Sequence, residues 1–142
     1  MANKINVLEC GPRDGWQNLK QMLTFEQKLD LIDRLFDAGV TQMEVTSFVS
    51  PKAIPQMQDA AKIVAYMLEK HPDIETFALV PNFQGAKLAA EAGLKKVAPV
   101  ISLSASHNMN NVRRTHQESF DELKRIMDTV SYTHLTLPTI LR

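Results

Sequence analysis

The chain has 142 residues, 44% of them hydrophobic and 23% charged, which is typical of one soluble globular domain. Its 16 basic and 16 acidic residues cancel, and no apolar run approaches the length of a membrane span. These properties exclude a polybasic nucleic-acid-binding protein and an integral membrane protein, so we expect neither nucleic acid nor a membrane among its partners. The lack of an apolar signal region at the start and the single cysteine, Cys10, predict a cytoplasmic location.

The first predicted strand leads directly into a pair of charged residues. Residues 5–8 form a short apolar run, and the Gly11-Pro12 pair ends it because proline has no backbone donor for the next ladder bond. Arg13 and Asp14 follow at once. A cation and a carboxylate at the carboxyl tip of a strand are typical of the catalytic face of an α/β barrel.

Helices are predicted between the later strands. Capping boxes at Thr24–Gln27 and Thr115–Glu118 each begin a helix, and a third helix starts near Pro55 or Gln56 and stops before Pro72. A shorter helix is predicted at 83–92. The glycines that suit a left-handed helix end are Gly39 and Gly93. The apolar faces of the three longer helices are predicted to consist of Phe25, Leu29, Ile32 and Phe36, then Met57, Ala61, Val64 and Leu68, and finally Phe120, Leu123, Met127 and Val130.

Strands at 42–46, 76–80 and 96–103 complete four successive βα units, which require parallel strands. Half of a TIM (β/α)8 barrel and a small doubly wound sheet both fit this order. No G-x-G-x-x-G or G-x-x-x-x-G-K loop occurs, and polar residues follow every strand. This pattern favours an α/β partial TIM barrel, about the first four βα units. The residues after the strands are Arg13, Asp14 and Gln17, then Glu44 and Ser47, then Asn82, and then Ser104, Ser106, His107 and Asn108.

Four motifs in order resemble hydroxymethylglutaryl-CoA lyases, a family of metal-dependent TIM-barrel enzymes. They are Glu9–Asn18, Glu44–Lys52, Pro55–Met57 and Leu79–Asn82, and the similarity extends from Ile5 to Thr129. The Arg-Asp-Gly core alone indicates only the wider superfamily of lyases and synthases. Trp16 departs from the leucine that these lyases more often carry, and we expect its ring to narrow the rim of the site.

The resemblance implies a lyase that cleaves an acyl-CoA substrate, 3-hydroxy-3-methylglutaryl-CoA, to acetoacetate and acetyl-CoA, with Mg²⁺ or Mn²⁺ bound, in leucine degradation. It implies that Arg13 and Glu44 are catalytic, with Arg13 meeting the developing oxyanion, and that Asp14 is a metal ligand. Gln17, Ser47 and Asn82 are then substrate-binding residues. The family's further ligands, a His-x-His pair and an asparagine, and its late-loop cysteine do not occur in this chain, so we expect the chain alone to be inactive.

Several alternatives remain at this point. Arg13 and Asp14 could form a structural ion pair, and Ser47 and Asn82 could be turn and cap residues. The chain could be a non-catalytic half-barrel module that pairs with another chain, or a related acyl-CoA lyase or synthase, and a homo-oligomer stays open. His107 and His116 are expected to be surface residues, and Cys10 a packed one.

The end of the chain does not look like a fifth strand of the family. Residues 131–142 contain no acidic residue, and their threonines and leucines nearly alternate. We expect a family segment at 1–130 and a non-family tail at 131–142 that arises from truncation or read-through. A genuine short strand is the alternative, because Leu-Thr-Leu alternation has the period of a strand.

Overall fold

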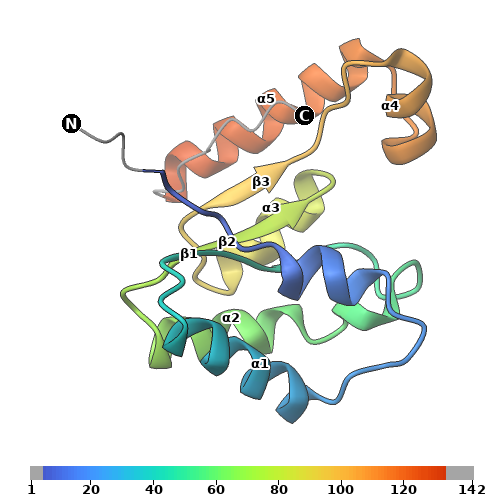
Figure 1. The fold of residues 1–142 in the computed structure, drawn as a ribbon. Coiled ribbons are helices and arrows are strands. Elements are labelled where there is room, and N and C mark those ends of the chain that lie inside the picture. Colours follow the sequence, from blue (N-terminus) through green and yellow to red (C-terminus); the bar gives the residue numbers. More distant parts are fainter. Residues whose placement is uncertain (1–4, 134–142) are drawn as a thin grey trace.

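A computed structural model describes residues 5–133 of the chain. Its sheet has three parallel strands in the order β1 (Gln42–Ser47), β2 (Glu75–Val80) and β3 (Val97–Pro99). Helices α1 (Phe25–Asp37) and α2 (Ala60–Lys70) lie together below β1 in Figure 1. Helix α3 (Phe83–Glu91) packs against β2 and α5 (His116–Thr133), and α4 (Ala105–Val112) follows the end toward which β3 points. The alternating parallel order confirms the predicted α/β class.

The first predicted strand is reduced to one bridge, so its prediction as a full strand is wrong. Glu9 pairs in parallel with Met43, and its amide donates to the Gln42 carbonyl at 3.0 Å. Ile5 and Val7 are 83% and 68% exposed, so the described residues do not bury their side chains. The bridge nevertheless places residues 9–15 beside β1, which is the position that the barrel order requires.

The helix starts and ends follow the local signals of the sequence. Thr24 and Gln27 form the predicted capping box at the start of α1. Thr115 and Glu118 form the reciprocal bonds before α5. Gly39 and Gly93 both have φ of +88°, the left-handed conformation that ends a helix without steric cost. The predicted stop before Pro72 is also confirmed, since α2 ends at Lys70.

Two predicted apolar faces are rotated from the observed ones. Pro55–Met57 is a separate 3₁₀ turn (η2), and α2 begins only at Ala60. The residues that form the buried face of α2 therefore differ from the predicted ones. In α5 the buried side chains include Ser119 and Ile126, because Glu122 of α5 accepts from the amide of Phe83 and fixes the helix orientation. The predicted members that are exposed instead are Ala61, Leu68, Phe120 and Met127, and Phe36 of the predicted face of α1 is exposed as well.

The region after the third strand also differs from the prediction. β3 ends at Pro99 instead of residue 103, because proline cannot donate to the ladder. Residues 105–112 form helix α4, although its serine and asparagines favour turns and helix caps over a helix interior. The fully buried Asn108 explains this helix: its side chain accepts from the Ser102 amide at 3.0 Å and donates to the Ser119 hydroxyl at 2.8 Å.

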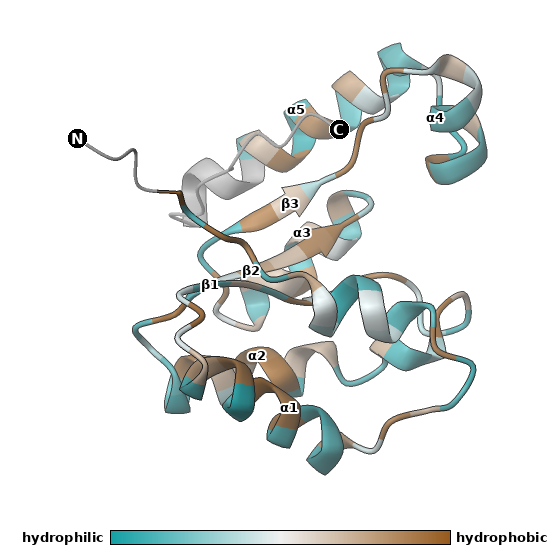
Figure 2. Cartoon of the chain, in the orientation of Figure 1, coloured by the Kyte–Doolittle hydropathy of each residue, from teal (hydrophilic) through white to brown (hydrophobic). Residues whose placement is uncertain are grey.

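The apolar core lies between the sheet and the helices α1, α2 and α3. Figure 2 shows hydrophobic residues along the strands and hydrophilic ones on the outer turns of the helices. Within the described range, no helix is long and apolar enough to cross a membrane. Helix α5 continues to Thr133, and residues 134–142, most of the tail singled out from the sequence, lie outside the described residues. The core members with no exposed surface are Ile32, Met43, Val45, Val64, Met67, Ala78, Val80, Ala89 and Val97.

Candidate active site

A single turn of π-helix, η1 (Gly11–Gly15), carries two of the charged residues of the site, Arg13 and Asp14. Pro12 at its first positions is compatible with the turn, because its missing amide would be unpaired there anyway. The carbonyl of Cys10 accepts from the amides of Arg13 at 3.1 Å and Asp14 at 2.7 Å. Turns of this kind are rare and frequently occur at functional sites. Here the turn directs one side chain inward and leaves the next exposed.

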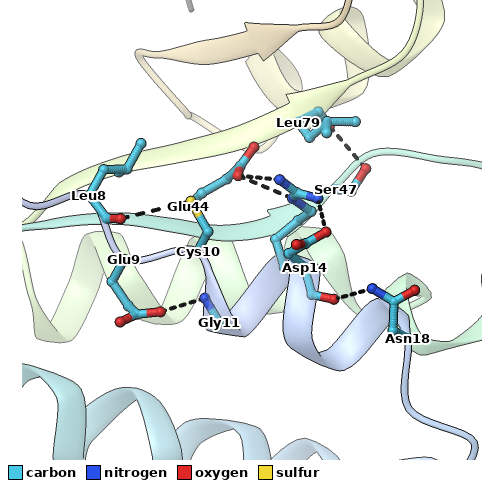
Figure 3. Close-up of polar contacts among 10 residues, drawn as sticks. Leu8, Glu9, Cys10, Gly11, Asp14, Asn18, Glu44, Ser47 and Leu79 are labelled. Carbon is cyan, nitrogen blue, oxygen red and sulfur yellow. Dashed lines mark hydrogen bonds and ion pairs between the residues drawn. The ribbon is translucent and has the colours of Figure 1, made fainter. Parts of the chain in front are cut away.

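Arg13 is buried and held by two carboxylates. Its Nε and Nη2 atoms donate to the same oxygen of Glu44, Oε2, at 3.1 and 2.8 Å (Figure 3). Its Nη1 atom donates to Asp14 Oδ1 at 2.6 Å. Arg13 and Glu44 are 6% and 5% exposed, so this pair is shielded from solvent and strongly directional. The guanidinium is therefore fixed in orientation before any ligand arrives.

Asp14 differs from Glu44 in its exposure. The Asp14 side chain is 57% exposed, whereas that of Glu44 is 6% exposed. One guanidinium faces two carboxylates, so the cluster has a formal charge of one negative, +1 − 2 = −1. An excess carboxylate next to solvent favours a bound cation, while Glu44 serves the arginine alone.

An irregularity in β1 directly follows Glu44. The parallel register with β2 pairs Glu44 with Phe77 and Thr46 with Ala78, so Val45 is an extra residue in β1. Bulges of this kind re-aim side chains and are enriched next to active sites. In β1 the bulge directly follows the residue that binds Arg13.

A cavity of about 850 Å³ opens in front of the Arg13–Glu44 pair. Its volume lies within the range of small-molecule sites. Asp14 and Gln17 line it at the η1 side, and an apolar wall from Ala98 to Ile101 follows the end of β3. The remaining lining residues are Val49, Ser50, Ala53, Ile54, Leu79, Pro81, Ser102, Leu103, Ser104, His107, Asn111 and Val112.

The structure brings four of the six residues singled out from the sequence to this cavity: Arg13, Asp14, Gln17 and Glu44. Two do not line it. The Ser47 hydroxyl donates to the Leu79 carbonyl at 3.2 Å, and the Asn82 side chain caps α3 by accepting from Gly85 at 2.9 Å. These contacts are those of strand-end and cap residues, the reading that the sequence had left open for both.

Sequence reasoning missed several cavity residues. Ser50 was named only as part of the Glu44–Lys52 motif, and it lines the cavity. His107 is exposed, as expected of a surface residue, and it also lines the cavity. His116 is half-buried and its Nε2 lies 2.9 Å from the Ser102 carbonyl. Trp16 does not narrow the rim, because its ring is 7% exposed and belongs to the core. The Ser-Pro-Lys motif after β1 was the signal that could have identified Ser50.

A metal ion would find one suitable ligand here. Asp14 offers an exposed carboxylate of the hard-oxygen type that Mg²⁺ and Mn²⁺ prefer. Among residues 5–133 there is no group of three or more His, Cys, Asp and Glu side chains that could hold a metal ion. The described residues therefore fit one ligand of such a site and do not form the whole of it.

Parallel strands with successive helices, and an arginine–carboxylate cluster from η1 and β1 beside a cavity, are features of a TIM-barrel enzyme fold. Comparison with known proteins identifies which barrel this is. The HMGL-like family model matches residues 4–136, so the chain belongs to the HMGL-like family.

Three relatives illustrate the similarity. The mitochondrial hydroxymethylglutaryl-CoA lyase of Macaca fascicularis is 35% identical over 137 residues, which are 96% of this chain and 42% of that protein. A 3-hydroxy-3-isohexenylglutaryl-CoA/hydroxymethylglutaryl-CoA lyase of Pseudomonas aeruginosa is 35% identical over 90% of this chain and 42% of its own length. The structure of an HMG-CoA lyase from Acinetobacter baumannii, in complex with coenzyme A and 3-methylmalate, matches with a TM-score of 0.85 and 35% identity.

The chain spans less than half of each of these relatives. The A. baumannii structure is covered over 43% of its length, and 93% of this chain takes part in the match. The chain is thus similar to the N-terminal portion of these lyases, and its fold is a partial TIM barrel.

Proposed function

We propose that this chain provides the N-terminal part of a carbon–carbon lyase that cleaves 3-hydroxy-3-methylglutaryl-CoA to acetoacetate and acetyl-CoA. The observation that carries the proposal is the buried Arg13, which Glu44 holds by two hydrogen bonds at the edge of the cavity. Cleavage next to a thioester leaves an enolate, whose negative oxygen requires a preorganised positive group. A guanidinium that is already oriented stabilises that charge without reorganisation.

Each residue of the cluster then has a separate task. Arg13 binds the thioester oxygen as negative charge develops on it. Glu44 is a positioning residue, since its carboxylate contacts the guanidinium at 2.8 Å and is shielded from solvent. Gln17 lines the same cavity, and our proposal assigns it a hydrogen bond to a substrate oxygen. Ser47 and Asn82 hold the strand end and α3 in place, and our proposal gives them this supporting task.

Asp14 is the proposed ligand of a divalent cation, Mg²⁺ or Mn²⁺. When bound, such an ion gathers substrate oxygens and favours ionisation of the substrate hydroxyl. The exposed Asp14 carboxylate and the formal negative charge of the cluster support this assignment. The other ligands would be water and groups that are not among the described residues.

Binding of the substrate tests this proposal. We expect the 142-residue chain to bind 3-hydroxy-3-methylglutaryl-CoA in the presence of Mn²⁺, as measured by isothermal titration calorimetry. Arg13→Met should weaken the affinity by at least about tenfold, because it removes charged hydrogen bonds. Arg34→Met is the matched control, because the Arg34 side chain is 74% exposed and lies outside the cavity lining. Equal affinities of the Arg13 and Arg34 variants would contradict the proposal.

The choice of acyl group is a second part of the proposal. The P. aeruginosa relative is named for an isohexenyl substrate as well as the methyl one. We favour the methyl substrate because the four motifs resemble hydroxymethylglutaryl-CoA lyases. Tighter binding of an isohexenylglutaryl-CoA in the same titration would reverse this choice.

The cellular setting is proposed on the same basis. We place the enzyme in leucine degradation in the cytoplasm, with a homo-oligomer as the assembly to test. The M. fascicularis relative is named as mitochondrial, so fractionation of cells that express the protein is the relevant measurement. Recovery with an organelle fraction would contradict the cytoplasmic assignment.

A further inference from the structure

A buried lysine lies outside the candidate active site and has no task in the chemistry described above. Lys28 is on α1 and is 1% exposed. Lysine is rarely buried to this extent unless its ammonium group is fully paired. Here it is paired with the segment that leads into α2: Nζ lies 2.7 and 2.9 Å from the two oxygens of Asp59, the residue before α2, and 2.5 Å from the Gln56 carbonyl in η2.

Lys28 also contacts the segment that carries the active-site arginine. Its Nζ atom lies 5.8 Å from the ring centroid of Trp16, within the range of a cation–π interaction. Trp16 directly follows η1, and its amide donates to the carbonyls of Gly11 and Arg13. The lysine therefore contacts the end of the turn whose side chains form the ion-pair cluster.

Gln56 provides a second connection between Lys28 and the segment that follows η1. The Gln56 side chain donates to the Leu19 carbonyl at 2.7 Å, while the Gln56 carbonyl accepts from Lys28. Ala53 and Ile54, immediately before this turn, line the cavity, as do Arg13 and Gln17 before Leu19. Lys28 thus joins two cavity-lining segments that are otherwise far apart in the sequence.

We infer that Lys28 is a positioning residue for the candidate active site. Its ammonium group holds the 11–19 segment and the 50–57 segment in one arrangement, and so sets the position of Arg13 relative to the opposite wall of the cavity. The inference rests on the proposed function for its consequence in ligand binding. Its structural part does not depend on the ligand, because it concerns only contacts within the chain.

A substitution that keeps the hydrocarbon packing isolates the role of the charge. Lys28→Met retains an unbranched side chain against Trp16 and removes the ammonium group. Arg34→Met on the same helix is the matched control, because the ion pair of Arg34 with Asp30 is exposed on both sides. Val97→Ala serves as a second control, since it removes core packing at the sheet without contacting the network.

Hydrogen exchange of backbone amides, followed by NMR on the 142-residue chain, reads the positioning directly. We expect Lys28→Met to accelerate exchange of the Arg13, Asp14 and Leu19 amides by about tenfold or more relative to the β2 amides. Arg34→Met should leave both sets unchanged, and Val97→Ala should act on the sheet. Trp16 is the only tryptophan, so its fluorescence provides a second signature, and Lys28→Met alone should change its emission maximum.

Binding of 3-hydroxy-3-methylglutaryl-CoA separates this inference from the proposed function. If the unsubstituted chain binds the ligand, Lys28→Met should weaken the affinity by about tenfold, whereas Val97→Ala should not when both are folded. If it does not bind, the proposed function fails and the exchange data still decide the positioning role. Uniform acceleration of exchange throughout Lys28→Met, or none at the Arg13 and Asp14 amides, would overturn the inference.

Discussion

The ion pair between Arg13 and Glu44 allows the most detailed prediction for a single substitution. Glu44→Gln keeps the shape and one acceptor oxygen, but it removes the carboxylate that faces a guanidinium with 6% exposure. Two hydrogen bonds, at 3.1 and 2.8 Å, change from charge-assisted on both sides to charged on one side only. Loss of the carboxylate from a buried pair costs about 3–5 kcal/mol when no other partner remains.

Asp14 remains as that other partner in the Glu44→Gln variant. Its carboxylate lies 2.6 Å from Arg13, but it is 57% exposed and compensates only in part. We therefore expect the free energy of unfolding to fall by about 2–3 kcal/mol, measured by urea denaturation followed by circular dichroism. Asp30→Asn is the control: it breaks the exposed pair with Arg34 and should cost about 0.5 kcal/mol or less.

A double variant examines the same reasoning from the opposite side. Arg13→Met combined with Glu44→Leu removes both buried charges, and such replacements are often neutral or stabilising. We expect it to be more stable than Glu44→Gln and to have lost ligand binding. The reasoning would be refuted if Glu44→Gln were as mild as Asp30→Asn, or if the double variant were the least stable of the three.

The remaining predictions concern one glycine and one tyrosine. Gly85→Ala should lower the free energy of unfolding by about 1–3 kcal/mol in thermal denaturation, because the new Cβ would lie 2.7 Å from the Phe48 carbonyl oxygen. Gly15→Ala is the control: its new Cβ meets nothing within 4 Å, so the change should be nearly neutral. Burial raises the pKa of Tyr66 to about 12, and the hydrogen bond from the Tyr66 hydroxyl to Asp33 is the next largest cause. In a titration followed by ultraviolet absorbance, one of the two tyrosines should therefore ionise only near pH 12. Because the folded-state pKa exceeds the ordinary value of 10.0, this contribution to stability is complete below pH 10 and is lost as the pH rises through 12. Asp33→Asn should lower the pKa of Tyr66, and an unchanged titration would contradict the assigned cause.

Local signals in the sequence were sufficient for most elements of the fold. The capping box at Thr24, the left-handed Gly39 and the apolar runs of β1 and β2 act over a few residues and could be predicted. The turn that carries Arg13 and Asp14 could also be predicted, because the Gly-Pro pair directly precedes them and begins η1. In each of these cases the determining contacts lie within one turn or one strand.

Long-range contacts explain what the sequence could not predict. Helix α4 depends on the bonds of the buried Asn108 to Ser102 and Ser119, which no local propensity reveals. In the sequence Lys28 looks like a solvent-exposed charge of an amphipathic helix, and only the fold brings it to its partner Asp59, the residue before α2. The Ser47 hydroxyl donates to the carbonyl of Leu79, which lies in the neighbouring strand and is distant in the sequence.

The position of Trp16 was wrong for a related reason. We expected the Trp16 ring at the rim of the site, but α1 brings Lys28 over this ring and the core encloses it. The rotated face of α5 has the same origin, because Glu122 reaches the amide of Phe83 in α3. Contacts between elements set these orientations, so the spacing of apolar residues within one element does not predict them.

The central claim is that this chain supplies the Arg13 site of a hydroxymethylglutaryl-CoA lyase, and turnover of a chimeric lyase tests it most directly. Residues 5–133 would replace the matching part of the A. baumannii lyase, which this chain resembles with a TM-score of 0.85. We expect the chimera to form acetyl-CoA from 3-hydroxy-3-methylglutaryl-CoA, and to stop when EDTA removes the divalent cation. Arg13→Lys in that chimera should reduce kcat by far more than it raises KM, because lysine lacks the planar fork that Glu44 orients. A folded chimera without activity, or an Arg13→Lys chimera at the unsubstituted rate, would contradict the account.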